Sequence, residues 1–300
     1  MKKIIIAGGS GFLGQLLADY FTQQNTEVVI LTRMHREDQH LIRYTKWDGK
    51  TIGYWITELE GAEALINLNG KSVDCRYTTA NKQEIYDTRL NATNVLGLAI
   101  SQCKKPPKVW INASSATIYR HAEDRDMDEA TGELGKGFSV DVCKKWERAF
   151  FNSATPNVRK VALRIAIVLG KNGGALKPLK HLVKFGLGGK QGSGKQYFSW
   201  VHEQDFVRVV DWVLNNQQAE GVYNVSSPNP LTNQDFMKAL RKVMNIPFGM
   251  PSPKWMLELG ARCTPSSPCT PFPSQHPFPL PWPPPPPCTP PPPPHPPPPP

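Results

Sequence analysis

A glycine-rich stretch near the start of the chain has the residue types and the spacing of a phosphate-binding turn. Gly8, Gly11 and Gly14 form the pattern G-x-x-G-x-x-G between an apolar run at residues 4–7 and a run with helical apolar spacing. Between a strand and a helix, such glycines allow a tight turn, a close approach of the backbone to a pyrophosphate and close helix packing. Amide groups at the helix start then face the anion. The sequence therefore predicts a dinucleotide site at this turn.

The end of the next predicted strand, residues 28–31, indicates which dinucleotide binds. An acidic residue at this strand end would bind the ribose 2′-hydroxyl of NAD, whereas an arginine suits the 2′-phosphate of NADP. Here the strand is followed by Thr32 and Arg33. A solvated strand end is the alternative role for Arg33. We favour NADP over NAD.

Apolar runs and amphipathic segments alternate through the first half of the chain. The predicted strands lie at residues 4–7, 28–31, 64–68, 108–111 and 161–165, and the predicted helices lie at residues 82–102 and 142–151. Such alternation is typical of a parallel sheet with helices on both faces. The predicted fold class is α/β, a Rossmann-type doubly wound parallel sheet with a smaller C-terminal α/β substrate lobe.

The residue composition of the chain changes after Gly170, where glycines cluster. A helix, a strand and a further helix are then expected at residues 203–215, 222–225 and from 232 onward. We assign these segments to the smaller lobe and expect an NAD(P)-binding domain over residues 1–170, with returning segments, and a substrate lobe over residues 171–262. A ligand would lie between the lobes, at the carboxyl ends of the strands.

The last stretch, residues 263–300, has the composition of a non-globular tail. From residue 265 onward, 22 of 36 residues are proline and none is charged. Proline fixes φ and lacks a backbone donor, so this tail cannot form a helix or an inner strand. We expect the globular part to end near Arg262, and we interpret the tail as a frameshifted or artefactual end. An evolved proline-rich ligand for a partner domain is the alternative.

The net charge and the cysteine content indicate which partners and which compartment suit the protein. The formal net charge is +10, but the lysines and arginines are scattered, which favours anionic small molecules over nucleic acid. The six cysteines show no disulfide framework and no zinc-binding spacing, so we expect reduced thiols in a cytoplasmic protein without a metal. No apolar run suits a signal peptide or a membrane span.

Several longer stretches, in order along the chain, resemble one family. They read "ALINLNG", "RYTTANKQEIYDTR", "INASSATIY", "LRIAIVLGKNGGAL", "GLGGKQGSGKQYFSWVHEQD" and "YNVSSPNPLTNQDF". The chain resembles the atypical extended short-chain dehydrogenase/reductases, and within them the sugar-nucleotide epimerase-like group of epimerase family proteins. The resemblance covers residues 1 to about 262.

The resemblance implies a set of site residues. Those implied to contact the cofactor are Gly8, Ser10, Gly11, Phe12, Leu13, Gly14, Arg33, Asp48, Asn69 and Gly70. Among them Asp48 would touch adenine, while Asn69 and Gly70 would lie along the cofactor. Ser115 matches the catalytic serine, whose hydroxyl would hydrogen-bond a substrate oxygen. For each polar position, capping of loop backbone is the alternative role.

The chain departs from the superfamily on the helix after Ser115. The superfamily usually carries Tyr-x-x-x-Lys there, but this helix reads "FSVDVCKKWERAF". One register places Lys144 at the lysine and Val140 at the tyrosine, and the other places Cys143 and Ser139 there. Neither register has the tyrosine. We retain Lys144 as the candidate for holding the ribose.

Other polar residues of the matched stretches carry further hypotheses. His202 and Asp205 match positions that the group shares, and histidine suits acid–base work near neutral pH. We favour a structural role for His202, in orienting the loop. Tyr119 resembles a tyrosine other than the catalytic one.

These observations predict an NADP-dependent oxidoreductase or epimerase-like enzyme that acts on a small, nucleotide-sugar-like substrate. The alternative is a non-catalytic NADP-binding sensor, which the missing tyrosine favours. A homodimer formed through two helices beside the cofactor is common in the superfamily and is expected on that ground alone.

Overall fold

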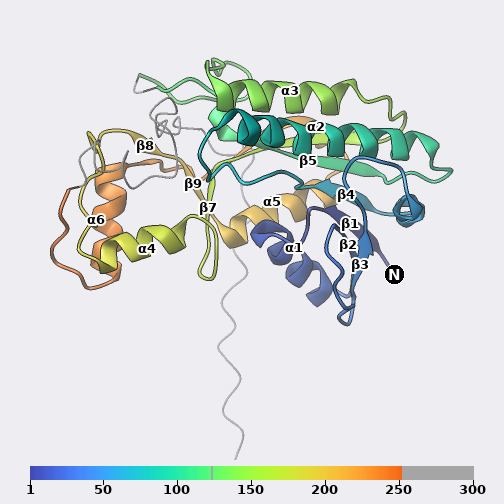
Figure 1. The fold of residues 1–300 in the computed structure, drawn as a ribbon, viewed down its shortest axis with the longest axis horizontal. Helices are drawn as coiled ribbons and strands as arrows, with labels where there is room; N and C mark the ends of the chain where they lie inside the picture. Colours follow the sequence, from blue (N-terminus) through green and yellow to red (C-terminus); the bar gives the residue numbers. More distant parts are fainter. Residues whose placement is uncertain (123, 252–300) are drawn as a thin grey trace, which may run out of the picture.

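The structure is a computed structural model that describes residues 1–122 and 124–251 (Figure 1). Its centre is a seven-stranded parallel sheet with the strand order β10-β6-β5-β4-β1-β2-β3. The strands are β1 (Lys3–Ala7), β2 (Glu27–Thr32), β3 (Ile42–Lys46), β4 (Ala64–Asn67), β5 (Val109–Ser115), β6 (Arg159–Ile165) and β10 (Gly221–Val225). The predicted doubly wound parallel α/β fold is confirmed. The predictions for the end of the globular part and for the tail lie outside the described residues.

Alternate residues of each strand belong to two core layers, one on each face of the sheet, because successive strand side chains point to opposite faces. In β1, Ile4 and Ile6 join one buried cluster, whereas Ile5 and Ala7 join the other. Both faces are covered, which explains why the strand is a continuous apolar run rather than an alternating one.

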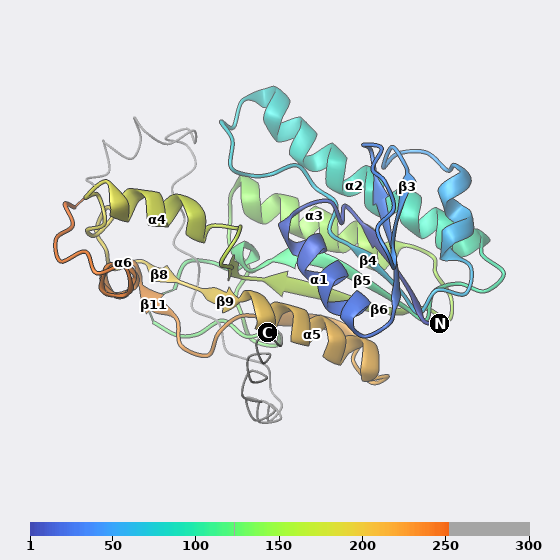
Figure 2. The ribbon, with the colours of Figure 1, turned by 90° about the horizontal axis from the view of Figure 1, so that it is seen from below.

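Four helices cover the two faces of the sheet. On one face lie α1 (Phe12–Gln23) and α5 (Glu203–Asn215), which Figure 2 shows side by side and which the Tyr20 hydroxyl joins by donating to Asp211 Oδ2 at 3.0 Å. On the other face lie α2 (Thr79–Gln102) and α3 (Phe138–Asn152), together with the short 3-10 helix η1 (Tyr54–Leu59). Each helix buries an apolar stripe against the sheet.

Both α2 and α3 begin earlier than the apolar spacing predicts. The Thr78 hydroxyl accepts a hydrogen bond from the Asn81 amide, which caps α2. Gly137, with φ 108°, turns the chain into α3. The extra turn of α2 contains the polar residues Thr79 and Asn81, whereas that of α3 contains Phe138 and the buried Val140, which the sequence analysis did not include in the helix.

A smaller lobe stands beside the sheet (Figure 1). We use "small lobe" for α4 (Leu176–Lys184), α6 (Asn233–Val243) and the antiparallel pair β8 (Tyr197–Phe198) and β11 (Leu231–Thr232). Its core contains Val183, Phe236 and Met237. The parallel pair β7 (Ile167–Leu169) and β9 (Trp200–His202) connects it to the sheet domain.

The structure differs from the expected grouping of the segments after Gly170. The helix expected at 203–215 and the strand expected at 222–225 are present, but they pack with the main sheet rather than with the small lobe. Val207 and Val210 of α5 belong to the core beneath β1, and β10 pairs with β6 in parallel. Spacing along the chain predicts such elements without telling which sheet they join. The domain bounds themselves stay a prediction.

Within the described part of the chain, no helix combines the length and the apolar character that crossing a membrane would need.

Candidate functional site

The glycine turn is shaped by close packing at two of its three glycines. Gly8 has φ 74°, and a Cβ there would lie 2.8 Å from the Asn69 Cα, so the turn presses on the segment that follows β4. A Cβ on Gly14 would overlap the Gly9 backbone where α1 meets the turn. Both positions therefore require glycine for steric reasons.

Gly11 differs, because the space beside it is open. It is exposed, and a Cβ there would meet only the Gly8 carbonyl oxygen, at 3.9 Å. Gly11 also precedes α1, and no side chain of the described part of the chain caps this helix start. First-turn amides of a helix lack partners within the helix, so they can bind an anion. The turn thus offers an open backbone cradle, which fits the diphosphate of a dinucleotide.

The other predicted residues of the turn lie around this cradle. Ser10 is half-buried in the turn, and Leu13 packs on the core beneath α1. The Phe12 ring lies against the glycine cluster after β7, since a Cβ on Gly174 would approach its Cε1 to 3.0 Å and one on Gly170 or Gly173 would overlap the ring. These glycines therefore let the cluster close over the Phe12 ring, a role that the sequence analysis missed.

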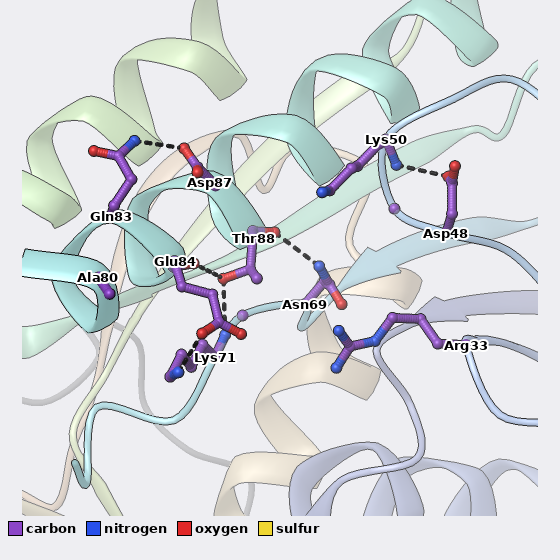
Figure 3. A pocket seen from close by; sticks show the side chains of 12 residues that line it. Arg33, Asp48, Lys50, Asn69, Lys71, Ala80, Gln83, Glu84, Asp87 and Thr88 are labelled. Carbon is purple, nitrogen blue, oxygen red and sulfur yellow. Dashed lines mark hydrogen bonds and ion pairs between the residues drawn. The ribbon is translucent and has the colours of Figure 1, made fainter.

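A pocket of ≈ 340 Å³ lies at the ends of β2, β3 and β4, and we call it the strand-end pocket (Figure 3). It brings together four residues predicted to contact the cofactor. Its lining is Arg33, Asp48, Gly49, Lys50, Asn69, Gly70, Lys71, Ala80, Gln83, Glu84, Asp87 and Thr88. Ser115, Lys144 and the glycine turn do not line it.

One wall of the strand-end pocket comes from α2 and was missed by the sequence analysis. Its members are spaced three and four residues apart, at Ala80, Gln83, Glu84, Asp87 and Thr88. This spacing puts them on one helix face, a signal that could have identified the wall. The Asn69 Nδ2 donates to the Thr88 carbonyl at 2.8 Å, which ties the segment after β4 to this wall.

Arg33 is exposed at the end of β2, and Figure 3 shows its guanidinium reaching toward Asn69. Among the described residues, no carboxylate lies within ion-pair distance of it. Its donors are thus free to bind a phosphate at the mouth of the pocket.

Asp48 organises the turn on the opposite edge of the pocket. Its Oδ2 accepts from the Thr51 hydroxyl at 2.7 Å, and its Oδ1 accepts from the amides of Thr51 and Lys50 at 2.9 and 2.8 Å. These hydrogen bonds, the Thr51 hydroxyl first, hold the pKa of Asp48 at about 2. The carboxylate caps backbone, which was the alternative to its predicted contact with adenine.

Ser115 ends β5 and lies with Thr117 and Cys143; we call these three residues the Ser115 group. The Ser115 Oγ accepts hydrogen bonds from the Thr117 amide at 3.3 Å and from the Thr117 hydroxyl at 3.1 Å. The Thr117 Oγ1 is 3.6 Å from the Cys143 Sγ. Burial raises the pKa of the Cys143 thiol, so this thiol is neutral.

The position of Cys143 shows which face of α3 meets Ser115. Lys144 is directed elsewhere, and its Nζ donates to the Gly135 carbonyl at 3.1 Å. Val140 also lies beside Gly135. The helix face bearing Ser139 and Cys143 therefore meets the Ser115 group. Lys144 as a ribose contact stays a prediction.

The remaining polar candidates have structural partners. The buried Tyr119 hydroxyl donates to the Asn224 Oδ1 at 3.0 Å and accepts from the Arg164 Nη1 at 2.7 Å. Arg164 in turn forms a buried ion pair with Glu147 at 2.8 Å. His202 caps α5, because its Nδ1 accepts from the Gln204 amide at 3.2 Å. This cap is the kind of structural role that we favoured for His202.

The model of the NAD dependent epimerase/dehydratase family matches residues 4–226. The chain belongs to this family. Membership supports the binding of a nicotinamide dinucleotide, and the resemblance to epimerase family proteins is confirmed.

One relative and two solved structures illustrate this membership. The epimerase family protein YfhF of Bacillus subtilis (strain 168) is 33% identical over 256 residues, which are 85% of this chain and 84% of the relative. The crystal structure of human epimerase family protein SDR39U1 with NADPH has a TM-score of 0.80 at 24% identity, covering 91% of this chain and 90% of that chain. MoeE5 in complex with UDP-glucuronic acid and NAD has a TM-score of 0.71 at 18% identity, covering 92% and 94%. At these identities, the likeness to the two structures is one of fold.

Proposed function

We propose that the chain is an NADP-dependent oxidoreductase or epimerase-like enzyme acting on a small, nucleotide-sugar-like substrate. The observation that carries this proposal is the open glycine turn at the carboxyl end of β1, next to Arg33 at the end of the adjacent strand β2, where no described carboxylate pairs with it. Together they offer amides to a diphosphate and a guanidinium to a 2′-phosphate.

The residues present fit a dinucleotide along the sheet edge. Gly8, Gly11 and Gly14 would hold the diphosphate, and Arg33 the 2′-phosphate. Asn69 and Gly70 would lie along the bound molecule on its way to the Ser115 group. A nicotinamide supplies hydride chemistry when bound. The solved human SDR39U1 structure with NADPH supports the choice of NADP.

The role of Ser115 is to hold a substrate oxygen by a hydrogen bond. Its hydroxyl accepts from Thr117 and retains its own proton for donation. Neither Lys144 nor the buried Tyr119 offers a proton at this place. Turnover should therefore be slow, since a positioned acid contributes about 10²–10⁴-fold. The complex of MoeE5 with UDP-glucuronic acid supports a nucleotide-linked substrate class.

The alternative function is a non-catalytic NADP sensor, which the missing tyrosine of the Tyr-x-x-x-Lys pattern favours. NADPH oxidation across a panel of carbonyl compounds and nucleotide-sugars separates the two functions. We expect slow turnover that is lost in Ser115→Ala. Tight NADPH binding without turnover on any substrate would favour the sensor, and fast turnover that survives Ser115→Ala would remove this site from consideration.

Two tyrosine variants compare the helix registers in the same assay. Ser139 and Cys143 share the face that meets the Ser115 group, whereas Val140 and Lys144 face Gly135. A gain in turnover with Ser139→Tyr, and none with Val140→Tyr, would identify the first face as the catalytic one. A gain with Val140→Tyr alone would restore the register that uses Lys144.

We further propose a cytoplasmic location, which the free thiols of Cys75, Cys103 and Cys143 support. The expected homodimer stays a prediction that size-exclusion chromatography with light scattering would test.

A further inference from the structure

The guanidinium of Arg89, on α2, lies behind the segment 69–71, which follows β4 and lines the strand-end pocket. Its Nη1 donates to the Lys71 and Ile85 carbonyl oxygens, both at 3.1 Å. The guanidinium carbon lies 5.1 Å from the centre of the Trp146 ring of α3. The charged group is therefore partly buried between α2, α3 and the segment 69–71.

The positive charge of Arg89 has no ionised partner within residues 1–122 and 124–251. No carboxylate there lies within ion-pair distance, whereas buried Arg164 pairs with Glu147 at 2.8 Å. The nearby Cys143 is a neutral thiol, because burial raises its pKa. Arg89 is half-buried, and this partial burial lowers its pKa, which reflects the cost of removing part of the charged group from water. Buried charges are normally paired.

Gly70 allows the segment 69–71 to lie close to Arg89. A Cβ on Gly70 would lie 2.9 Å from the Arg89 Cζ and 3.1 Å from each of Nη1 and Nη2. Glycine at position 70 thus lets the backbone rest on the guanidinium. Gly70 lines the strand-end pocket, as do Lys71 and Thr88 (Figure 3). Among the described residues, the Arg89 Nη2 and Nε donate no hydrogen bond, so these groups remain available to a ligand.

We infer that Arg89 binds a phosphate oxygen of a ligand held between the segment 69–71 and α3. A guanidinium binds phosphate through paired, charge-assisted hydrogen bonds, and such a pair would compensate the buried charge. Two ligands can supply this chemistry: the diphosphate of the dinucleotide, or the diphosphate of a nucleotide-linked substrate. The inference rests on the proposed function, because both ligands belong to it.

Binding measurements on Arg89→Gln and Arg89→Lys test the inference. The glutamine keeps a donor for the backbone carbonyls but removes the charge, and the lysine keeps the charge without the paired geometry. The matched control is Arg159→Gln. Arg159 also donates to two backbone carbonyls, of Ala219 and Val213 at 2.6 and 2.9 Å, and burial lowers its pKa too. It lies at the amino-terminal end of β6, whereas the pocket lies at the carboxyl ends of β2, β3 and β4.

Calorimetric titrations with NADPH, and with UDP in the presence of saturating NADPH, distinguish the two phosphate sources. We expect Arg89→Gln to weaken one of the two ligands about ten- to hundredfold, with Arg89→Lys in between and Arg159→Gln unchanged. Weaker NADPH binding identifies the dinucleotide as the source, and weaker UDP binding alone identifies the substrate.

The outcomes separate this inference from the proposed function. If the original protein binds NADPH and the Arg89 variants bind both ligands equally well, Arg89 is only a clamp for the Lys71 and Ile85 carbonyls and the inference is wrong. If the original protein binds neither NADPH nor UDP, the proposed function fails as well. Circular dichroism checks folding, and if Arg89→Gln does not fold, the comparison of Arg89→Lys with the original protein decides.

Discussion

The strand-end pocket and the Ser115 group lie at the carboxyl ends of strands of the same sheet, yet they are built differently. The pocket is open and lined by polar side chains, with Arg33 and Asp48 exposed on its rim. The Ser115 group adjoins a closed network in which Ser114 donates to Glu147 at 2.6 Å and Glu147 pairs with Arg164. Polar groups in the pocket can therefore serve a ligand, whereas those behind Ser115 serve the fold.

This difference implies a division of effects. Substitutions behind Ser115 should lower stability and leave dinucleotide affinity unchanged. Substitutions of Gly11 and Arg33, which border the open space of the turn and the pocket, should lower dinucleotide affinity and leave stability nearly unchanged. The variants below test this division, from the largest expected effect to the smallest.

Glu147→Ala should have the largest effect on stability. It leaves the Arg164 guanidinium buried without its carboxylate, and breaking a buried pair in this way costs about 3–5 kcal/mol. Urea unfolding followed by fluorescence would measure the loss. The folded fraction should bind NADPH as the original protein does. A loss of unfolding free energy below about 1 kcal/mol would show that this ion pair does little to stabilise the region behind Ser115.

Gly14→Ala and Gly11→Ala should separate packing from ligand binding within one turn. The Cβ at position 14 would overlap the Gly9 backbone, and overpacking of this kind costs up to about 3 kcal/mol. Position 11 has open space and φ −84°, so alanine there should change stability by less than about 0.5 kcal/mol. Its methyl group would instead occupy the cradle and weaken NADPH binding. Thermal unfolding and fluorescence titration give the two readouts, and unchanged affinity in Gly11→Ala would argue against a diphosphate at this turn.

Arg33→Asp should weaken NADPH binding and spare NADH. A charge-assisted hydrogen bond to a 2′-phosphate contributes about 1.5–3 kcal/mol, or roughly ten- to hundredfold in affinity. NADH lacks that phosphate, so its affinity should stay the same or rise. Equal affinities of the original protein for the two cofactors would contradict the preference for NADP. Because Arg33 is exposed, the unfolding midpoint should not move.

Asp48→Asn should have the smallest effect, a loss of stability that is present above about pH 4 and vanishes in acid. The folded-state pKa of Asp48 is about 2, below the ordinary value of about 3.9 in an unfolded chain. The carboxylate therefore stabilises the fold above about pH 4, and this contribution is lost as the pH falls toward 2. Because Asp48 is exposed and screened by solvent, we expect less than about 1 kcal/mol. Unfolding midpoints at pH 5 and pH 2.5 should differ less in Asp48→Asn than in the original protein, and an identical difference in both would contradict the assignment.

The sequence by itself determined the features that depend on local order. The apolar run, the glycine turn and the helix after it are consecutive, and their physical requirements act within about twenty residues. The alternation of strands and helices likewise predicted the parallel sheet. Arg33 could be named because the end of the second strand follows from the same local pattern.

Tertiary structure alone decided which residues meet. One residue along a helix rotates a side chain by about 100°, so only packing shows that Cys143 rather than Lys144 faces Thr117. β10 joins the main sheet by long-range pairing with β6, and α5 packs on the core beneath β1; the chain carries no local signal for either contact. The contact of Gly70 with Arg89 joins a loop to a helix across 19 positions. Such contacts arise because burial and strand pairing act between segments that are distant in the chain.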